Sequence, residues 1–435
     1  MAKSAPGTAG LPLLGDKSYE FYKNPVKFLM KRMADNKSRV FLTRFLNKPT
    51  VFVGSNKVVH ELLNEHSDKL ELGYKQFMEE IYGENILFTD GDFSTGLRDA
   101  LSELFTVDAI KTYQSDIDRI VKNAIKDILT GAPVCIYMLF KKLAIEICLS
   151  LFLGLDFSQS DASLVTDLTV THWHGIISVP VAVKIPMMNE TTYSKALDAK
   201  RKLLEVINER RKEKCHQFPQ HVERLPNFSD VLVNNHLLLF TSALIPKALS
   251  SILTSFMIEI GSEVGNQNML LEDPDLLERY LLEVVRLYPP FLGGRRIIRE
   301  EVICGGFRFP AGHALLYMTY AAHRDPDVFD QPDAFMPERW SQHNKNDQDK
   351  LFTLGAGPRQ CIGEQLVWTI IKTVINELLR GYTVKLLPDQ DLAYKWLPVS
   401  RPKGNVLVTF QGRNSNSLSR SLYPDTVDKP KGEYL

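Results

Sequence analysis

Leu354-Gly-Ala-Gly-Pro-Arg-Gln-Cys-Ile-Gly363, near the end of the 435-residue chain, is the most informative stretch of the sequence. It places one cysteine, Cys361, among three glycines, with Arg359 two residues before it. Glycines let the backbone turn tightly and lie flat against a large planar group. They also leave peptide N–H groups free to point at the sulfur, which suits a thiolate metal ligand. The stretch predicts a ligand loop around Cys361.

The residues next to this cysteine predict a site that holds negative charge. Arg359 would place a fixed positive charge near the carboxylates of a bound cofactor. Residues 364–381 are predicted to form a helix whose N-terminus points at the sulfur and favours its anionic form. The alternative is a glycine-rich turn around a buried structural cysteine, which the match of ten consecutive residues to one pattern disfavours.

The ten residues resemble the cysteine-ligand loop of the cytochrome P450 family, and the resemblance extends from about residue 10 to 411. It implies haem b (iron protoporphyrin IX) as the cofactor, bound to iron through Cys361, with Gly355 and Gly363 among the cofactor-binding residues. The family usually has Phe where this chain has Leu354, so the packing under the haem is expected to differ.

The resemblance also implies the architecture: mainly α with a small β region, the cytochrome P450 fold. We predict a single domain over residues 1–435, in which residues 412–435 form a C-terminal tail. The hydrophobic pattern agrees, with helices expected at 25–36, 117–129 and 196–214. The strand pair 40–44 and 50–54 and the hairpin 302–310 make up part of the β region.

A second motif, Glu283-Val-Val-Arg286, lies on a predicted helix that two prolines follow. Residues three apart share a face of a helix, so Glu283 and Arg286 can pair. Pro337-Glu-Arg339-Trp follows downstream. By resemblance, Glu283, Arg286 and Arg339 form the buried structural triad that fixes the family's core near the cysteine loop.

Two more arginines are candidate contacts for the haem carboxylates by resemblance. Arg296 matches the family arginine that follows the Glu-x-x-Arg helix, and Arg98 matches that of an early helix at the haem edge. Four residues before Arg98 the family usually has Trp or His, whereas this chain has Ser94. His323 also matches a family signature and is expected to pack in the structure rather than bind metal.

The resemblance breaks in the helix expected to cross the distal haem face, Leu238-Leu-Phe-Thr-Ser-Ala-Leu-Ile-Pro-Lys247. Oxygen-activating P450s carry an acid–alcohol pair there, which orients water and delivers protons. Leu244 replaces the acid and Ile245 the alcohol. Pro246 should kink the helix, and hydroxyls such as that of Ser242 are expected to bond to carbonyls of their own helix. These substitutions predict a dry, apolar distal pocket formed by Ser242, Leu244, Ile245 and Pro246.

Composition limits the partners and the compartment. The chain has 52 Lys+Arg and 52 Asp+Glu, so nothing suggests a nucleic-acid partner. The five cysteines lack paired spacing, which indicates a reducing compartment. We find no transmembrane anchor or signal peptide in the sequence and expect a soluble, cytoplasmic protein, although peripheral membrane association or a removed anchor stays possible.

Three functions remain open from the sequence. The first is a P450-type monooxygenase that oxidises an apolar small molecule, such as a terpenoid, sterol or fatty-acid derivative. It would need a reductase or ferredoxin as electron donor, because the chain has no flavin or iron–sulfur motif. The second is a reductase-independent enzyme acting on a peroxide or hydroperoxide, as a peroxygenase, isomerase or dehydratase. The third is a non-catalytic haem or lipid binder.

Overall fold

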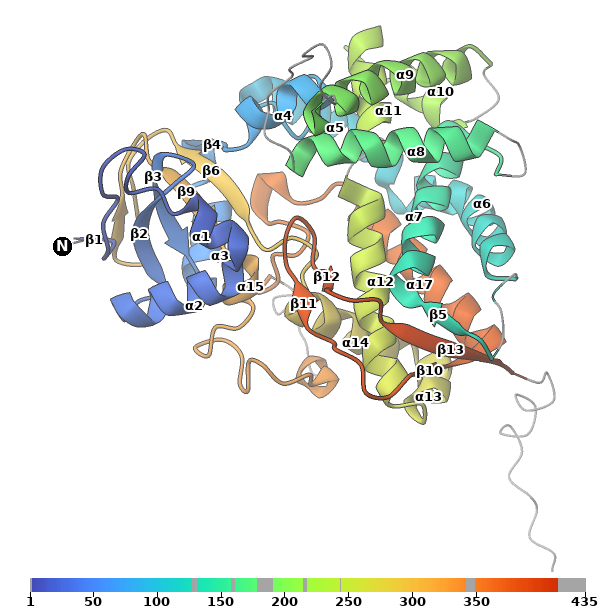
Figure 1. The fold of residues 1–435 in the computed structure, drawn as a ribbon. Helices are drawn as coiled ribbons and strands as arrows, with labels where there is room; N and C mark the ends of the chain where they lie inside the picture. Colours follow the sequence, from blue (N-terminus) through green and yellow to red (C-terminus); the bar gives the residue numbers. More distant parts are fainter. Residues whose placement is uncertain are drawn as a thin grey trace, which may run out of the picture.

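A computed structural model describes residues 2–126, 128, 131–157, 161–177, 191–213, 217–242, 244–341 and 349–413. Helices dominate the described chain, and short strands form several small sheets (Figure 1). The predicted mainly α fold with a small β region is therefore confirmed. The predicted tail lies outside the described residues from 414 onward.

The helices are α1 (Ser18–Lys23), α2 (Pro25–Asn36), α3 (Asn56–Asn64), α4 (Lys75–Tyr82), α5 (Gly91–Ser102), α6 (Val107–Lys126), α7 (Ile136–Leu153), α8 (Asp161–His174), α9 (Thr192–Glu213), α10 (Gln217–Glu223), α11 (Asp230–Ser242), α12 (Leu244–Ser262), α13 (Asn266–Glu272), α14 (Pro274–Leu287), α15 (Thr319–Ala322) and α17 (Glu364–Gly381). The strands are β1 (Lys3–Ser4), β2 (Val40–Phe45), β3 (Lys48–Val53), β4 (Leu70–Leu72), β5 (Pro133–Cys135), β6 (Gly294–Ile298), β7 (Val302–Cys304), β8 (Phe307–Phe309), β9 (Ala314–Tyr317), β10 (Tyr382–Leu386), β11 (Tyr394–Lys395), β12 (Arg401–Pro402) and β13 (Leu407–Gly412).

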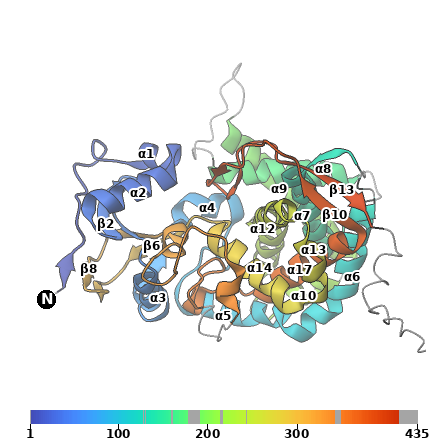
Figure 2. The ribbon, with the colours of Figure 1, turned by 90° about the horizontal axis from the view of Figure 1, so that it is seen from below.

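The largest sheet joins the first part of the chain to a segment more than two hundred residues later. Its strand order is β2-β3-β9-β6-β4, so strands from the first hundred residues pair with strands from residues 294–317. Figure 2 shows this part at one end of the molecule together with α1, α2 and α3, and most of the other helices at the other end. Smaller sheets have the orders β1-β8-β7, β10-β13-β5 and β11-β12.

Local sequence signals explain several boundaries. The Asn24 side chain accepts the N–H of Lys27 and Pro25 occupies the first turn, which begins α2 where predicted. The side chain of Asp273 caps α14 in the same way, ahead of a proline. Gly305 and Gly306 have positive φ values of 55° and 77°, which lets β7 and β8 close into the predicted hairpin.

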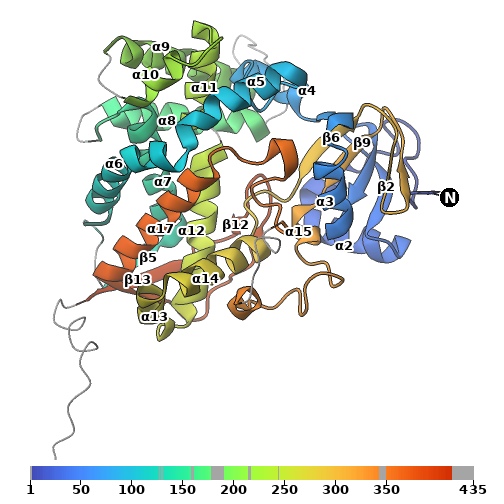
Figure 3. The same ribbon diagram turned by 180° about the vertical axis from the view of Figure 1, so that it is seen from behind.

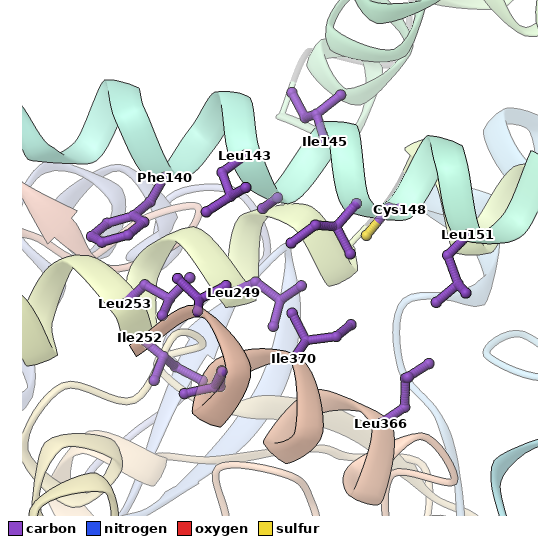
Figure 4. Close-up of a cluster of buried hydrophobic side chains, with 14 of the residues drawn as sticks. Phe140, Leu143, Ile145, Cys148, Leu151, Leu249, Ile252, Leu253, Leu366 and Ile370 are labelled. Atoms are coloured by element: carbon purple, nitrogen blue, oxygen red, sulfur yellow. The ribbon is translucent and has the colours of Figure 1, made fainter. Parts of the chain in front are cut away.

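The core lies between α7, α12 and α17. Figure 4 shows Phe140 and Leu143 of α7 facing Leu249 and Leu253 of α12, and Figure 3 shows α17 beside α12. These side chains are buried, as is Ile370 of α17. By length and composition one described helical segment, Asp230–Ser262, could cross a membrane, but 81% of its most apolar window is buried inside the protein.

Candidate active site

The loop before α17 holds Cys361 by a compact set of backbone contacts. The Cys361 N–H donates to the carbonyl of Leu354 at 2.7 Å, which closes the loop. Gly355 and Gly357 have φ values of +81° and +61°, a region that side chains disfavour. A Cβ on Gly357 would lie 2.1 Å from the carbonyl oxygen of Leu63, so only glycine fits there. The loop needs these glycines in order to bring Cys361 into place.

Cys361 lies deep in the fold and still has exposed surface. Burial raises the pKa of its thiol, opposed by the N–H of Gly363, which is directed at the sulfur, and by the charge of Arg98; the Glu364 carboxylate raises the pKa further. The side chain is nevertheless accessible to solvent. The free thiol is expected to stay protonated, and metal coordination would remove its proton.

Cys361 is placed to act as a single protein ligand. In the part of the chain that the structure describes, no group of three or more His, Cys, Asp or Glu side chains is arranged to hold a metal ion. A single thiolate suits a metal whose remaining ligands come from a macrocycle. The helix α17 begins three residues after the cysteine, and Gly363 lies 4.0 Å from the sulfur, measured from the position that its Cβ would take.

Arg98 and Arg359 lie beside the cysteine loop. Arg98 of α5 donates to the carbonyl oxygen of Gln360. Arg359 donates to Asp90 and to the carbonyl of Thr89, both at 2.8 Å, and also to the hydroxyl of Ser94 at 2.8 Å. Ser94, which stands where the family usually has Trp or His, therefore holds Arg359 in this protein.

Arg296 of β6 completes a group of three cations. Burial lowers the pKa of Arg359; Asp90 raises it and Arg296 lowers it. Burial also lowers the pKa of Arg98, and the charge of Arg359 lowers it further. Three guanidinium groups thus lie close enough to act on one another beside the cysteine loop. Guanidinium groups form paired hydrogen bonds with carboxylates, so the group is suited to a ligand that carries carboxylates.

The Glu-x-x-Arg motif forms a buried ionic centre. Glu283 and Arg286 have no exposed side-chain surface, and their paired hydrogen bonds measure 2.7 and 2.8 Å. Arg339 donates to Glu283 at 3.0 Å, as do the indole of Trp340 at 3.0 Å and the N–H of Met336 at 2.8 Å. Burial by itself raises the pKa of Glu283, but Arg286 and the other donors lower it below its usual value. The three predicted triad residues are in contact.

Hydrogen bonds connect this centre to the cysteine loop through His323. The N–H of Phe352 donates to Nε2 of His323 at 2.7 Å, so Nδ1 carries the proton and donates to the carbonyl of Arg286 at 3.2 Å. The hydroxyl of Thr353 donates to the carbonyl of Val285 at 2.8 Å. The Glu283–Arg286 helix therefore positions the residues that begin the loop.

The distal segment, residues 238–247, has apolar residues at the two positions of the acid–alcohol pair. Ile245 packs against the main hydrophobic cluster and Pro246 is buried. The structure does not describe the side chain of Leu244, so its place in the predicted pocket stays a prediction. The hydroxyls of Thr241 and Ser250 donate to carbonyls of their own helices at 2.7 and 2.6 Å, as the sequence suggests. The segment belongs to two helices: α11 ends at Ser242 and α12 begins at Leu244.

Comparisons with known proteins identify this arrangement. The family model described as Cytochrome P450 matches residues 260–410. A putative cytochrome P450 120 from a Synechocystis strain is 26% identical over 440 residues, which cover 93% of this chain and 96% of the relative. Cytochrome P450 26B1 from Danio rerio is 22% identical, covering 94% of this chain and 87% of the relative. The chain belongs to the cytochrome P450 family.

Two solved P450 structures share the fold. A retinoic acid-bound cyanobacterial protein, CYP120A1, aligns with a TM-score of 0.82 at 24% identity, covering 95% of this chain and 100% of that one. Cytochrome P450EX alpha with myristic acid aligns with a TM-score of 0.76 at 18% identity, covering 94% of this chain and 100% of that one. These similarities establish the fold alone.

Family membership makes haem b the cofactor of this P450, and the residues present fit it. Cys361 offers a sulfur that is accessible to solvent, and the three arginines beside its loop are suited to the two propionates of the haem. At a coarse level the family implies an oxidoreductase of the monooxygenase type that uses a small-molecule substrate and redox partners. The individual contacts of Arg98, Arg296, Arg359, Gly355 and Gly363 with haem stay predictions.

Sequence reasoning missed one polar cluster on the distal side. Nδ1 of His172, in α8, lies 2.7 Å from the hydroxyl of Ser242, and its Nε2 lies 2.9 Å from the carbonyl of Ile81. A carbonyl only accepts, so Nε2 carries the proton and Nδ1 accepts. The Ser242 hydroxyl also lies 2.9 Å from the carbonyl of Leu238 in its own helix, as the sequence predicts, so its one proton is shared between Nδ1 and that carbonyl. Nothing in the sequence around His172 signals this contact, because Ser242 is 70 residues away.

Proposed function

We propose that this P450 is a monooxygenase that oxidises an apolar small molecule of the terpenoid, sterol or fatty-acid class, and that apolar carboxylic acids are its best candidate substrates. The cysteine loop with its three arginines carries the proposal, because it fits a thiolate-bound haem. The two structural relatives hold retinoic acid and myristic acid, both apolar acids. The bound haem would supply the oxidation chemistry.

The chain's own residues prepare the site on both faces. On the proximal face, the N–H of Gly363 and the charge of Arg98 stabilise negative charge on the Cys361 sulfur. On the distal face, Ile245 and Pro246 exclude water and favour an apolar substrate. A reductase or ferredoxin would supply electrons. The cytoplasmic location of the protein stays a prediction from the sequence.

The same distal face supports a second candidate function, reductase-independent chemistry on a peroxide or hydroperoxide. Such chemistry needs the thiolate and the haem but no acid–alcohol pair. Ile245 has no proton to give, and the one hydroxyl proton of Ser242 is already engaged by Nδ1 of His172 and the carbonyl of Leu238. In this reading a carboxylate of the substrate would take the place of the missing acid.

Restoring the acid–alcohol pair is expected to separate the two functions. In the Leu244→Asp, Ile245→Thr double variant, turnover of myristic acid with an electron donor should rise about a hundredfold, because a placed proton donor contributes roughly 10²–10⁴ in rate. Turnover with hydrogen peroxide should not rise. The control is Leu244→Asn with Ile245→Val, which matches the shapes without an acid or a hydroxyl.

Each outcome assigns the function. Wild-type turnover with the electron donor that already equals that of the double variant would show that water or substrate supplies the protons. Wild-type turnover only with peroxide would favour the second candidate. No turnover with either oxidant across apolar acids, sterols and terpenoids would contradict both functions and leave a non-catalytic haem or lipid binder.

A further inference from the structure

Four basic residues from four different elements gather beside the start of α12. We call this group the cationic cluster; its members are Lys141 of α7, His174 at the end of α8, Lys247 of α12 and Arg401 of β12. Lys141, Lys247 and Arg401 are half-buried. Across the residues that the structure describes, none of these three forms an ion pair with a carboxylate. A cluster of one sign with no counter-charge is unusual inside a fold.

Packing contacts bring the elements of the cluster together. The hydroxyl of Ser250 in α12 donates to the carbonyl of Phe140 at 3.3 Å, next to Lys141. The hydroxyls of Ser251 and Ser400 lie 2.9 Å apart, next to Arg401. Lys247 lies one helical turn before Ser251, on the same face of α12. Figure 1 shows α12 beside α7, with β12 close to α12.

Aromatic rings, rather than carboxylates, contact the cations. Nζ of Lys247 lies 5.7 Å from the ring centre of Trp173, which is buried in α8. The guanidinium of Arg401 lies 5.3 Å from the ring centre of Tyr137 in α7. Cation–π contacts are attractive but weaker than an ion pair in a partly buried setting. The site therefore combines unneutralised positive charge with apolar surface.

The charges of the cluster act on one another. Burial lowers the pKa of Lys247 to about 8, and the charges of Lys141 and Arg401 lower it further. Burial, Lys247 and Lys141 likewise lower the pKa of His174. This repulsion destabilises the folded protein, and a bound anion would relieve it.

We propose that the cationic cluster binds the carboxylate of an apolar acid substrate and so fixes the end of the substrate that is not oxidised. The planar guanidinium of Arg401 suits two-point contact with a carboxylate, and Lys247 adds a point charge. The half-buried ring of Tyr137 offers apolar surface to the adjoining chain, and Trp173 is buried against Lys247. Lys247 is two residues from Ile245, so the site adjoins the distal segment. This inference rests on the proposed function in one respect, namely that the bound acid is a substrate.

Binding of myristic acid and of its methyl ester to the holoenzyme, measured by calorimetry without an electron donor, tests this assignment. Wild type should prefer the acid. Lys247→Gln should weaken binding of the acid about tenfold, since a charge-assisted hydrogen bond is worth that much, and should leave ester binding within about twofold. Arg401→Gln is a second variant with the same expected result. Lys142→Gln, which removes an exposed neighbouring charge, should bind the acid as wild type does.

The pH dependence gives an independent readout. Lys141, His174 and Arg401 face Lys247, and only its charged form attracts the carboxylate. Acid binding should therefore weaken as the pH rises through about 8, where Lys247 loses its proton, and ester binding should not.

The outcomes distinguish this inference from the proposed function. Equal affinity of wild type for acid and ester, or an acid preference that survives in both Lys247→Gln and Arg401→Gln, would overturn the cluster as a carboxylate site. Selective loss of acid binding in the variants would support it even if no acid were ever oxidised. In that case the proposed function alone would fail.

Discussion

Replacing Glu283 with glutamine is expected to cost about 3–5 kcal/mol of the free energy of unfolding, because it leaves Arg286 as an unpaired buried charge. Glu283 accepts hydrogen bonds from Arg286, Arg339, Trp340 and the N–H of Met336, and the pair has no exposed surface. A glutamine offers one acceptor oxygen and turns two donors toward groups that only donate. Urea denaturation, followed by circular dichroism, measures the loss.

A matched control lies on the same helix. Glu278 forms an ion pair with Lys372 at 3.1 Å, with both side chains about 40% exposed. Glu278→Gln should cost under about 1 kcal/mol, as exposed pairs do. Similar losses for the two variants would contradict the account of a buried ionic centre. Glu283→Gln should also weaken haem retention, because His323 and Thr353 link this helix to the cysteine loop.

Lowering the pH from 7 to 4.5 is expected to destabilise the protein steeply through three buried histidines. Burial lowers the pKa of His172 and His236 to about 4 and that of His323 to about 3, against 6.5 for an exposed histidine. Below pH 6.5 the unfolded chain takes up protons at these positions and the folded protein does not. The stability is therefore complete above pH 6.5 and is lost as the pH falls toward 4.

The size of the acid effect follows from the number of protons. Three histidines give a slope of about 4 kcal/mol per pH unit at most. Burial raises the pKa of Glu146 and Glu259, and these carboxyls oppose the trend. Both carboxyls therefore keep the slope below that maximum. Urea midpoints between pH 7.5 and 4.5 measure it. A midpoint that stays constant from pH 6.5 to 5 would show that the histidines are not buried and neutral.

Much of the fold could be predicted because its signals are local. Residues 25–36 and 364–381 match α2 and α17, since Asn24 and Pro25 mark the start of α2 and a continuous apolar face runs along α17. The hairpin at 302–310 follows from paired glycines. The prediction at 117–129 found only the second half of α6, which begins at Val107, although Ile110 and Tyr113 continue the same buried face toward its start.

The site was predictable only in part. Cys361 and the Glu283–Arg286 pair lie in short motifs whose spacing has a physical meaning. By contrast, other contacts of the site join residues that are far apart in the sequence. Examples are the contacts of Arg359 with Asp90 and Ser94, and the contact between His172 and Ser242. The cationic cluster has the same origin, because it exists only once four separate elements pack together. Such contacts leave no pattern along the chain.

The most direct test of the central claim is the carbon-monoxide difference spectrum of the reduced protein, recorded for wild type and Cys361→Ala. The account predicts a haem-thiolate band in wild type and its complete loss in the variant, because Cys361 is the protein's thiolate ligand to the iron. The variant replaces residue 361 only and keeps Gly363, which lies next to the sulfur in wild type. An unchanged thiolate band in Cys361→Ala, or a wild-type protein that takes up no haem, would contradict the account.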